Sequence, residues 1–135
     1  MSNAHWKSIA EEAAAVRAGT TTALSNVEKA LRLIEEHNEY QAIISTIEVR
    51  ATRRAKEIDE AVQAGKEVGR LAGVPFIAKD NFLTFGSETT AASNILRGFE
   101  APYQSTAIAR LEAEGAICVA KANLDGFAHG GSTEN

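Results

Sequence analysis

The sequence predicts an α/β fold in which amphipathic helices precede part of a mixed, helix-flanked β-sheet. Residues 1–67 repeat apolar side chains at the three- and four-residue spacing of helices. Two short apolar runs, residues 71–78 and 116–120, have the length and composition of buried strands. A helix-like segment lies between them, and this strand–helix–strand order is typical of a parallel or mixed sheet.

The first two helices are predicted from their N-terminal signals. Ser8 and Glu11 have the spacing of a capping box, in which each side chain bonds the other residue's backbone. Gly19 can adopt the left-handed turn that closes the first helix. Ser25 and Glu28 repeat the capping-box spacing, so we expect the second helix to begin there.

The second helix is expected to stop near Asn38, and the segment after it is ambiguous. Tyr40–Ile47 is short and apolar, which suits either an extended passage or the lead-in to a helix. A third helix is then predicted to end at Gly65. Its apolar face consists of Ala51, Ala55, Ile58 and Val62.

The second half of the chain is expected to form the sheet. In Leu71–Ala78 the early Pro75 sits where a strand needs no backbone donor, which suits a buried strand. Residues 86–104 are rich in small residues and predict a loop with a short helical piece. Ala116–Ala120 is the second buried strand, and Cys118 within it is expected to be a structural thiol.

One further helix is predicted between these strands. Ser105 can cap it, and it is expected to run through Glu114 and stop at Gly115. Its inward side chains are predicted to be Ile108 and Leu111.

Composition narrows the function classes. The net charge of −4 argues against a broad nucleic-acid surface, which needs a basic face. A single cysteine cannot form an internal disulfide, so we expect a reducing compartment, the cytoplasm. No apolar run approaches the ~20 residues of a membrane span.

Residues 2–4 resemble a cloning remnant, and residues 132–135 do not resemble a finished terminus, so we expect a truncated domain.

Few residues point to chemistry by themselves. Lys79 leaves an apolar strand, where partial drying makes an amine available as a base, although such a lysine more often reaches water. Asp80 beside it would favour the charged amine unless it points away. Gly130–Thr133 could offer backbone N–H groups to an anion or a carbonyl oxygen, or be a plain turn. The histidines, His5, His37 and His129, lack metal-ligand spacing, so no metal site is expected.

Four stretches in register resemble the amidase-signature family, in particular the branch that contains the A subunits of tRNA amidotransferases. The lysine motif is Leu71–Asn81, and the others are Glu88–Ser93, Ala101–Thr106, and Lys121–Asp125 with Gly131–Asn135. The resemblance implies that residues 1–135 are the N-terminal portion of a single amidase domain. Residues 1–67 would be its helical region, and residues 68–135 the start of its sheet core.

The resemblance also implies a mechanism and an assembly. The family uses a Ser–cis-Ser–Lys triad, of which only Lys79 has a counterpart here, as the base. Gly131 and Ser132 are candidate substrate-side residues. The implied reaction is hydrolysis of glutamine, whose ammonia serves transamidation of Glu-tRNA(Gln) or Asp-tRNA(Asn). Subunits B and C would complete a heterotrimer and contact the tRNA. This chain would need no cofactor or membrane, whereas ATP and Mg²⁺ would act at a partner subunit.

Two alternatives remain open at this point. The chain could belong to a stand-alone amidase acting on another small amide. It could instead be a non-catalytic interaction module, since the triad serines have no counterpart in these residues and the chain alone is expected to be inactive.

Overall fold

The computed structural model describes residues 7–133, and the small sheet in that range is mixed. Its strands are β1 (Ile43–Thr46), β2 (Pro75–Lys79) and β3 (Ile117–Ala122), in the order β1-β3-β2. β3 pairs parallel with β2 and antiparallel with β1. The α/β fold class with a mixed, helix-flanked sheet is therefore confirmed. The suggested cloning remnant at residues 2–4 lies outside the described residues, as does His5.

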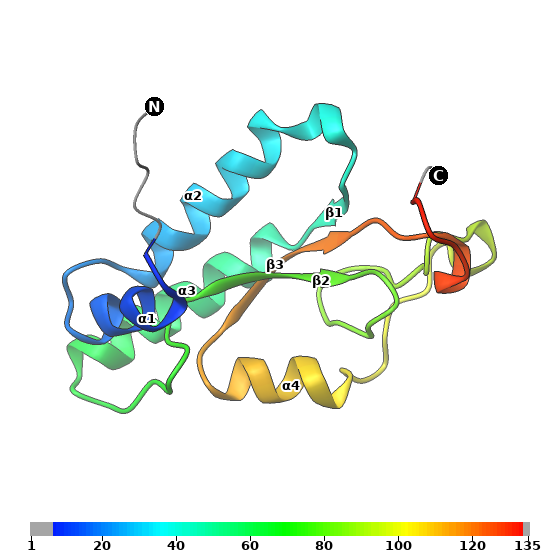
Figure 1. Ribbon diagram of the computed structural model, residues 1–135. Helices are drawn as coiled ribbons and strands as arrows, with labels where there is room; N and C mark the ends of the chain where they lie inside the picture. Colours follow the sequence, from blue (N-terminus) through cyan, green and yellow to red (C-terminus); the bar gives the residue numbers. More distant parts are fainter. Residues whose placement is uncertain (1–6, 134–135) are drawn as a thin grey trace, which may run out of the picture.

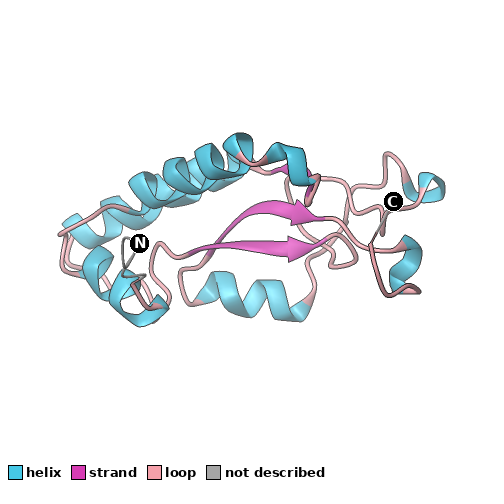
Figure 2. Cartoon of the chain, turned by 45° about the horizontal axis from the view of Figure 1, so that its top comes forward, coloured by secondary structure: helices cyan, strands magenta, loops and turns pink. Residues whose placement is uncertain are grey.

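The helices cover both faces of the sheet. They are α1 (Ile9–Arg17), α2 (Ala23–Glu36), α3 (Glu48–Gln63) and α4 (Thr106–Ala113), with short 3₁₀ turns η1 (Asn38–Tyr40), η2 (Asn94–Leu96) and η3 (Gly126–Ala128). Figures 1 and 2 show α4 on one side of the sheet and α2 on the other. None of the helices within residues 7–133 is long and apolar enough to cross a membrane.

Two apolar clusters hold these layers together. The larger joins the helices α1, α2 and α3 to β3 through Val16, Val27, Ala51, Ala55, Ile117 and Val119. The smaller lies on the α4 side and contains Ile47, Ala78, Ile108 and Cys118. Cys118 is fully buried, and this burial raises the pKa of its thiol, so the expectation of a structural cysteine is confirmed.

Several helix signals act as the sequence predicts. The Ser8–Glu11 capping box is formed in both directions. Gly19 has a φ of 74° after α1, and Gly65 has a φ of 69° after α3. Ser105 caps α4 by accepting a hydrogen bond from the backbone N–H of Ile108.

Three local predictions are wrong. The cap of α2 is Thr22, whose hydroxyl accepts the N–H of Ser25, so Ser25 lies inside the first turn. Leu111 is 37% exposed, and the buried inward position of α4 is taken by Glu112, which arginines of α3 neutralise. The strand at residues 71–78 begins only at Pro75.

The β2 strand is also less buried than predicted. Among the described residues it is an edge strand, and Ile77 is 47% exposed. An edge strand tolerates Pro75, which has no N–H to donate to a neighbour. The ambiguous Tyr40–Ile47 segment proves to be a 3₁₀ turn followed by β1, which adds a strand ahead of residue 68.

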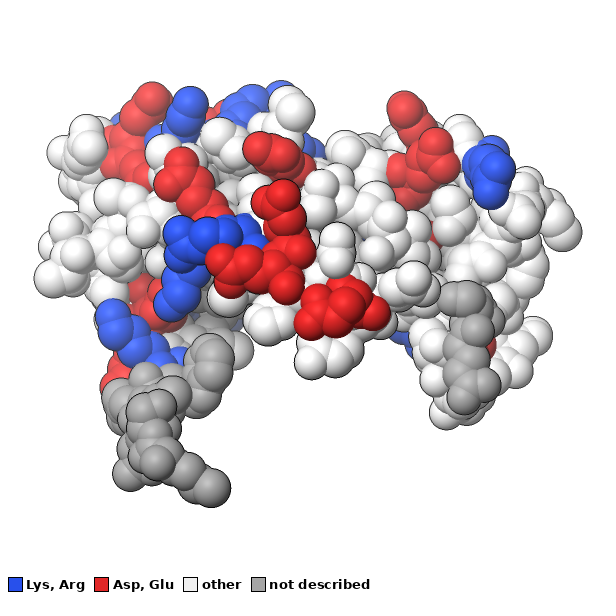
Figure 3. Space-filling view, turned by 90° about the horizontal axis from the view of Figure 1, so that it is seen from above, with Lys and Arg blue, Asp and Glu red and all other residues white. Residues whose placement is uncertain are grey.

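Charged side chains of both signs are interspersed on the helical part of the molecule. Figure 3 views the molecule from above and shows red and blue atoms side by side over that part. The uncharged atoms dominate the other end of the same face.

Candidate functional site

Lys79 lies at the carboxyl end of the parallel strand pair. It is the last residue of β2 and its partner in the register is Ala122, the last residue of β3. In open α/β sheets, ligands bind at this edge, beyond the carboxyl ends of the strands. The side chain of Lys79 is exposed and makes no hydrogen bond or ion pair with any residue between 7 and 133. Its amine is therefore available to a substrate or to a further segment of protein.

A buried ion pair lies directly beside Lys79. The Lys121 ammonium on β3 is 3.1 Å from Oδ1 of Asp80, and the two side chains are 0% and 1% exposed. The ammonium also donates to the backbone oxygen of Phe82 at 2.9 Å and to the hydroxyl of Thr89 at 3.4 Å. Oδ1 receives no hydrogen bond of good geometry, so the charge of Lys121 is what stabilises it. Removing either partner would leave a buried charge uncompensated.

The rest of Asp80 is anchored to two neighbouring segments. Its other oxygen, Oδ2, accepts from the N–H of Thr90 at 3.1 Å and from the Thr90 hydroxyl at 2.5 Å. Its backbone N–H donates to Ala122, and its backbone oxygen accepts from Ala91, both at 3.0 Å. These bonds fix the chain immediately after Lys79, and so they fix the point from which the Lys79 side chain leaves the sheet.

The stretches that resemble the amidase-signature family meet around this end of β2. Ala91 bonds to Asp80 as described, and its oxygen accepts from the N–H of Phe127 at 2.9 Å. Ser105 donates its N–H to the oxygen of Leu83 at 2.9 Å. Segments that lie tens of residues apart in the sequence are therefore bonded to one another beside Lys79.

The 126–133 segment, which contains the exposed Gly131 and Ser132, lies at the same end of the sheet (Figure 1). The carboxylate of Asp125 organises this loop by accepting the N–H of Thr133 at 2.7 Å. A Cβ on Gly130 would clash with the carboxyl group of Asp125, so this close approach requires glycine. No hydrogen bond joins Gly131 or Ser132 to Lys79 in the described residues, and their substrate-side role stays a prediction.

The sequence analysis includes Lys121 only as part of a motif and does not predict its ion pair with Asp80. A signal was present: Lys121 lies between alanines at the end of an apolar strand, and a buried lysine needs a charged partner. The partner itself depends on the β2–β3 register, which the sequence does not reveal.

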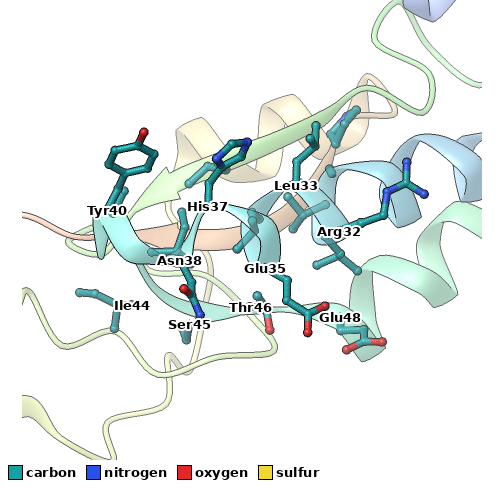
Figure 4. Close-up of a pocket in the computed structure, with 18 of the residues that line it drawn as sticks. Arg32, Leu33, Glu35, His37, Asn38, Tyr40, Ile44, Ser45, Thr46 and Glu48 are labelled. Atoms are coloured by element: carbon teal, nitrogen blue, oxygen red, sulfur yellow. The ribbon is translucent and has the colours of Figure 1, made fainter.

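The described residues also form a cavity beside the strand β1. It has a volume of about 1090 Å³ and is bounded by α2, η1, β1 and the start of β2. Figure 4 shows Leu33, His37, Tyr40 and Ile44 around it. Lys79, Gly131 and Ser132 are absent from its lining.

Metal-ligating side chains do not gather in the described part of the chain. No group of three or more His, Cys, Asp or Glu residues between 7 and 133 could hold a metal ion. His37 instead stacks on Tyr40 and faces Glu39 at 3.9 Å.

Comparison with known proteins assigns the chain to one family. The Amidase family matches residues 25–135, so the chain belongs to the Amidase family. Its sequence is 47% identical over 104 residues to the A subunit of the glutamyl-tRNA(Gln) amidotransferase of Synechococcus sp. (strain JA-3-3Ab), covering 77% of this chain and 20% of that protein.

Solved structures give the same assignment. A chain from a vestigial protein complex, connected with the origins of an s-triazine catabolic enzyme, superposes with a TM-score of 0.90 and 31% identity, over 96% of this chain and 29% of that one. The A subunit of the glutamyl-tRNA(Gln) amidotransferase of Thermotoga maritima superposes with a TM-score of 0.64 and 29% identity, over 83% and 22%. The chain spans 18% to 25% of the length of the curated relatives it matches.

Proposed function

We propose that the chain is the N-terminal portion of the glutaminase subunit of a tRNA amidotransferase, with Lys79 as its catalytic base. In this role a neutral Lys79 amine takes a proton from a hydroxyl, which then attacks the side-chain amide of glutamine. The ammonia released serves transamidation of Glu-tRNA(Gln) or Asp-tRNA(Asn). Residues 1–67 and 68–135 would be the helical region and the start of the sheet core of one amidase domain.

The observation that carries this proposal is the setting of Lys79. An exposed amine with no partner among the described residues leaves the carboxyl end of a parallel strand pair, and its point of departure is fixed by the bonds of Asp80. A base needs both properties: it must be within reach of the hydroxyl, and it must have a defined position. The identities of 40% to 51% to the A subunits of glutamyl-tRNA(Gln) amidotransferases support glutamine as the substrate.

The proposal extends to the assembly. The partners would be subunits B and C in a heterotrimer, and the tRNA would be bound through a partner, since this chain carries a net charge of −4. ATP and Mg²⁺ would act at the partner subunit, and this chain would hold no cofactor. The cytoplasm is the proposed compartment, where Cys118 would stay reduced.

The deciding experiment measures ammonia release from glutamine by an amidase subunit that contains these 135 residues, with subunits B and C present. Lys79→Ala should lower kcat by at least about 100-fold, the usual contribution of a general base. Lys66→Ala is the matched control, because Lys66 is an exposed lysine remote from the strand ends, and it should leave the rate unchanged. Full activity of Lys79→Ala would refute the role of Lys79.

The same experiment separates the alternatives. A stand-alone amidase would be inert to glutamine with its partners present, yet would hydrolyse another small amide. We expect the isolated 135-residue chain to be inactive. Glutamine hydrolysis by that chain, abolished in Lys79→Ala, would contradict this expectation.

A further inference from the structure

The base role assigned to Lys79 raises an electrostatic question about its neighbour Asp80. A carboxylate next to a lysine stabilises the ammonium form, which has no lone pair and cannot accept a proton. Asp80 is 0% exposed, so water does not screen its charge as it would at the surface. Without compensation, this charge would oppose the chemistry expected of Lys79.

The compensation comes from the other strand of the parallel pair. Lys121 approaches Oδ1 of Asp80 at 3.1 Å, and its own side chain is 0% exposed. The pair is therefore sealed inside the protein, while the side chain of Lys79 extends into solvent from the adjacent position. The two lysines are thus placed differently: Lys121 is the buried counterion of Asp80, whereas Lys79, next to Asp80 in the sequence, is unpaired within the described residues.

The other ionisable groups around the pair are neutral or engaged elsewhere. Glu88 accepts the N–H of Gly98 at 2.9 Å, and Asp125 accepts the N–H of Thr133. On β3 itself, burial raises the pKa of the Cys118 thiol, which keeps it neutral. On β1, the residue opposite Lys121 is Ser45, and His129 lies on the exposed loop after η3. Within residues 7–133, Lys121 is accordingly the one cation that forms an ion pair with Asp80.

We propose that Lys121 is a positioning residue for catalysis: it neutralises the buried Asp80 carboxylate so that the adjacent Lys79 amine is free to act as a base. This inference rests on the proposed function for its catalytic meaning. During the reaction a hydroxyl O–H bond breaks and an N–H bond forms at Nζ of Lys79. The proton later leaves with the departing ammonia. Lys121 takes no part in the proton transfer and acts only through its ion pair with Asp80.

The charge effect can be measured on the 135-residue chain without any enzymatic activity. Trace acylation by acetic anhydride at a pH of about 8.5 reports the neutral fraction of each lysine, because only the neutral amine reacts. Because the Lys79 amine itself lies in water, an effective dielectric constant of about 40 to 80 applies between it and the buried pair. At a charge separation on the order of 8 Å, one unit charge then changes the neutral fraction by about two- to sixfold. Mass spectrometry compares Lys79 with the exposed, remote Lys66 in the same sample.

The two single variants should change the acylation rate of Lys79 in opposite directions, which a merely structural role of Lys121 would not produce. Lys121→Met leaves Asp80 uncompensated and should slow the acylation of Lys79 by about two- to sixfold. Asp80→Asn leaves the Lys121 charge uncompensated and should accelerate it by a similar factor. The double variant Asp80→Asn/Lys121→Met should restore the original rate, and Lys66 should not change in any of them.

An unchanged Lys79 rate, or a change in the same direction in both single variants, would overturn the proposal. If Lys121→Met fails to fold, as judged by circular dichroism, the nearly isosteric Asp80→Asn still tests the proposal. Only a faster acylation of Lys79 in Asp80→Asn supports the proposal.

The pH profile of kcat/KM in the complete amidotransferase then connects the charge to catalysis. Its acidic limb should move to higher pH in Lys121→Met, to lower pH in Asp80→Asn, and back in the double variant. If the acylation rates change in the expected directions but Lys79→Ala retains full glutaminase activity, the proposed function fails. The effect of the Asp80 and Lys121 charges on the Lys79 amine would then still hold. If Lys79→Ala is inactive but the single variants share the original profile, the inference fails and the proposed function stands.

Discussion

Glu112 offers the clearest test of how charge stabilises this fold. It lies on α4 with a side chain only 6% exposed, and it accepts hydrogen bonds from the guanidinium of Arg50 on α3 at both carboxylate oxygens. Gln104 donates to the same carboxylate at 2.7 Å, and Arg54 donates to the backbone oxygen of Glu112 at 3.0 Å. This cluster links α3, α4 and the 86–104 loop.

The substitution Glu112→Gln keeps the shape of the side chain and removes its charge. Two largely buried arginines then lose their counterion, since the side chain of Arg50 is 15% exposed and that of Arg54 is 21% exposed. Breaking such a pair should lower the free energy of unfolding by about 2 to 4 kcal/mol. For a domain of this size, that corresponds to a fall in Tm of about 6 to 16 °C. Differential scanning calorimetry measures it.

The matched control is Glu57→Gln. Glu57 pairs with Arg53 at 3.9 Å, but both side chains are more than 60% exposed, so its loss should cost less than about 0.5 kcal/mol. A Tm of Glu112→Gln within about 2 °C of the original chain would refute the argument that burial makes this cluster important.

The pH dependence of stability follows from the same carboxyl. Burial alone would raise the pKa of Glu112, but the hydrogen bonds from Arg50 and Gln104 outweigh it and lower the pKa below its ordinary 4.5. A depressed folded-state pKa means that the stabilisation is present above the unfolded value of 4.5 and is lost as pH falls through the folded value. Below pH 4.5 the unfolding free energy of the original chain should therefore fall more steeply than that of Glu112→Gln. Parallel curves in urea titrations would contradict this.

Two further predictions concern the exposed edge and the 126–133 loop. Ile77 is 47% exposed on the edge strand β2, so we expect the 135-residue chain to self-associate. Ile77→Lys should increase the monomer fraction measured by light scattering. A cleanly monomeric original chain would count against this expectation. Gly130→Ala should displace Asp125 and speed amide exchange at Thr133 on the order of tenfold, since one hydrogen bond is lost. Gly131→Ala meets no atom within 4 Å and should leave that exchange rate unchanged.

The elements that could be predicted from the sequence are those whose signals are local. The capping box at Ser8 and the cap at Ser105 act through backbone groups three residues away, and neither depends on the rest of the fold. The strand β3 was predictable because its apolar run is buried on both faces. β1 was ambiguous because Ile43–Thr46 is only four residues long, and its pairing with β3 determines its conformation.

The errors arise where a distant residue decides the outcome. Leu111 was predicted inward from helical spacing, but the arginines of α3 draw Glu112 into that position instead. In the same way, Thr22 rather than Ser25 caps α2, and the first N–H groups of that helix bond to the Asp59 carboxylate of α3, at 2.7 Å from Ala23. Periodicity cannot detect an ion pair between helices that are far apart in the sequence.

The candidate site also depends partly on local sequence and partly on contacts between residues that are far apart in the chain. Lys79 became a catalytic candidate through four local stretches in register, whereas the buried counterion of its neighbour Asp80 is Lys121, which lies 42 positions further along the chain. The Asp80–Lys121 ion pair forms because the parallel register of β2 and β3 brings residue 121 alongside the end of β2. A sequence in which residue 121 were neutral would preserve the lysine motif and still leave the buried Asp80 carboxylate without its counterion. The motif therefore marks Lys79 as the proposed base, whereas the proposed effect of Lys121 on that base can be inferred only from the fold.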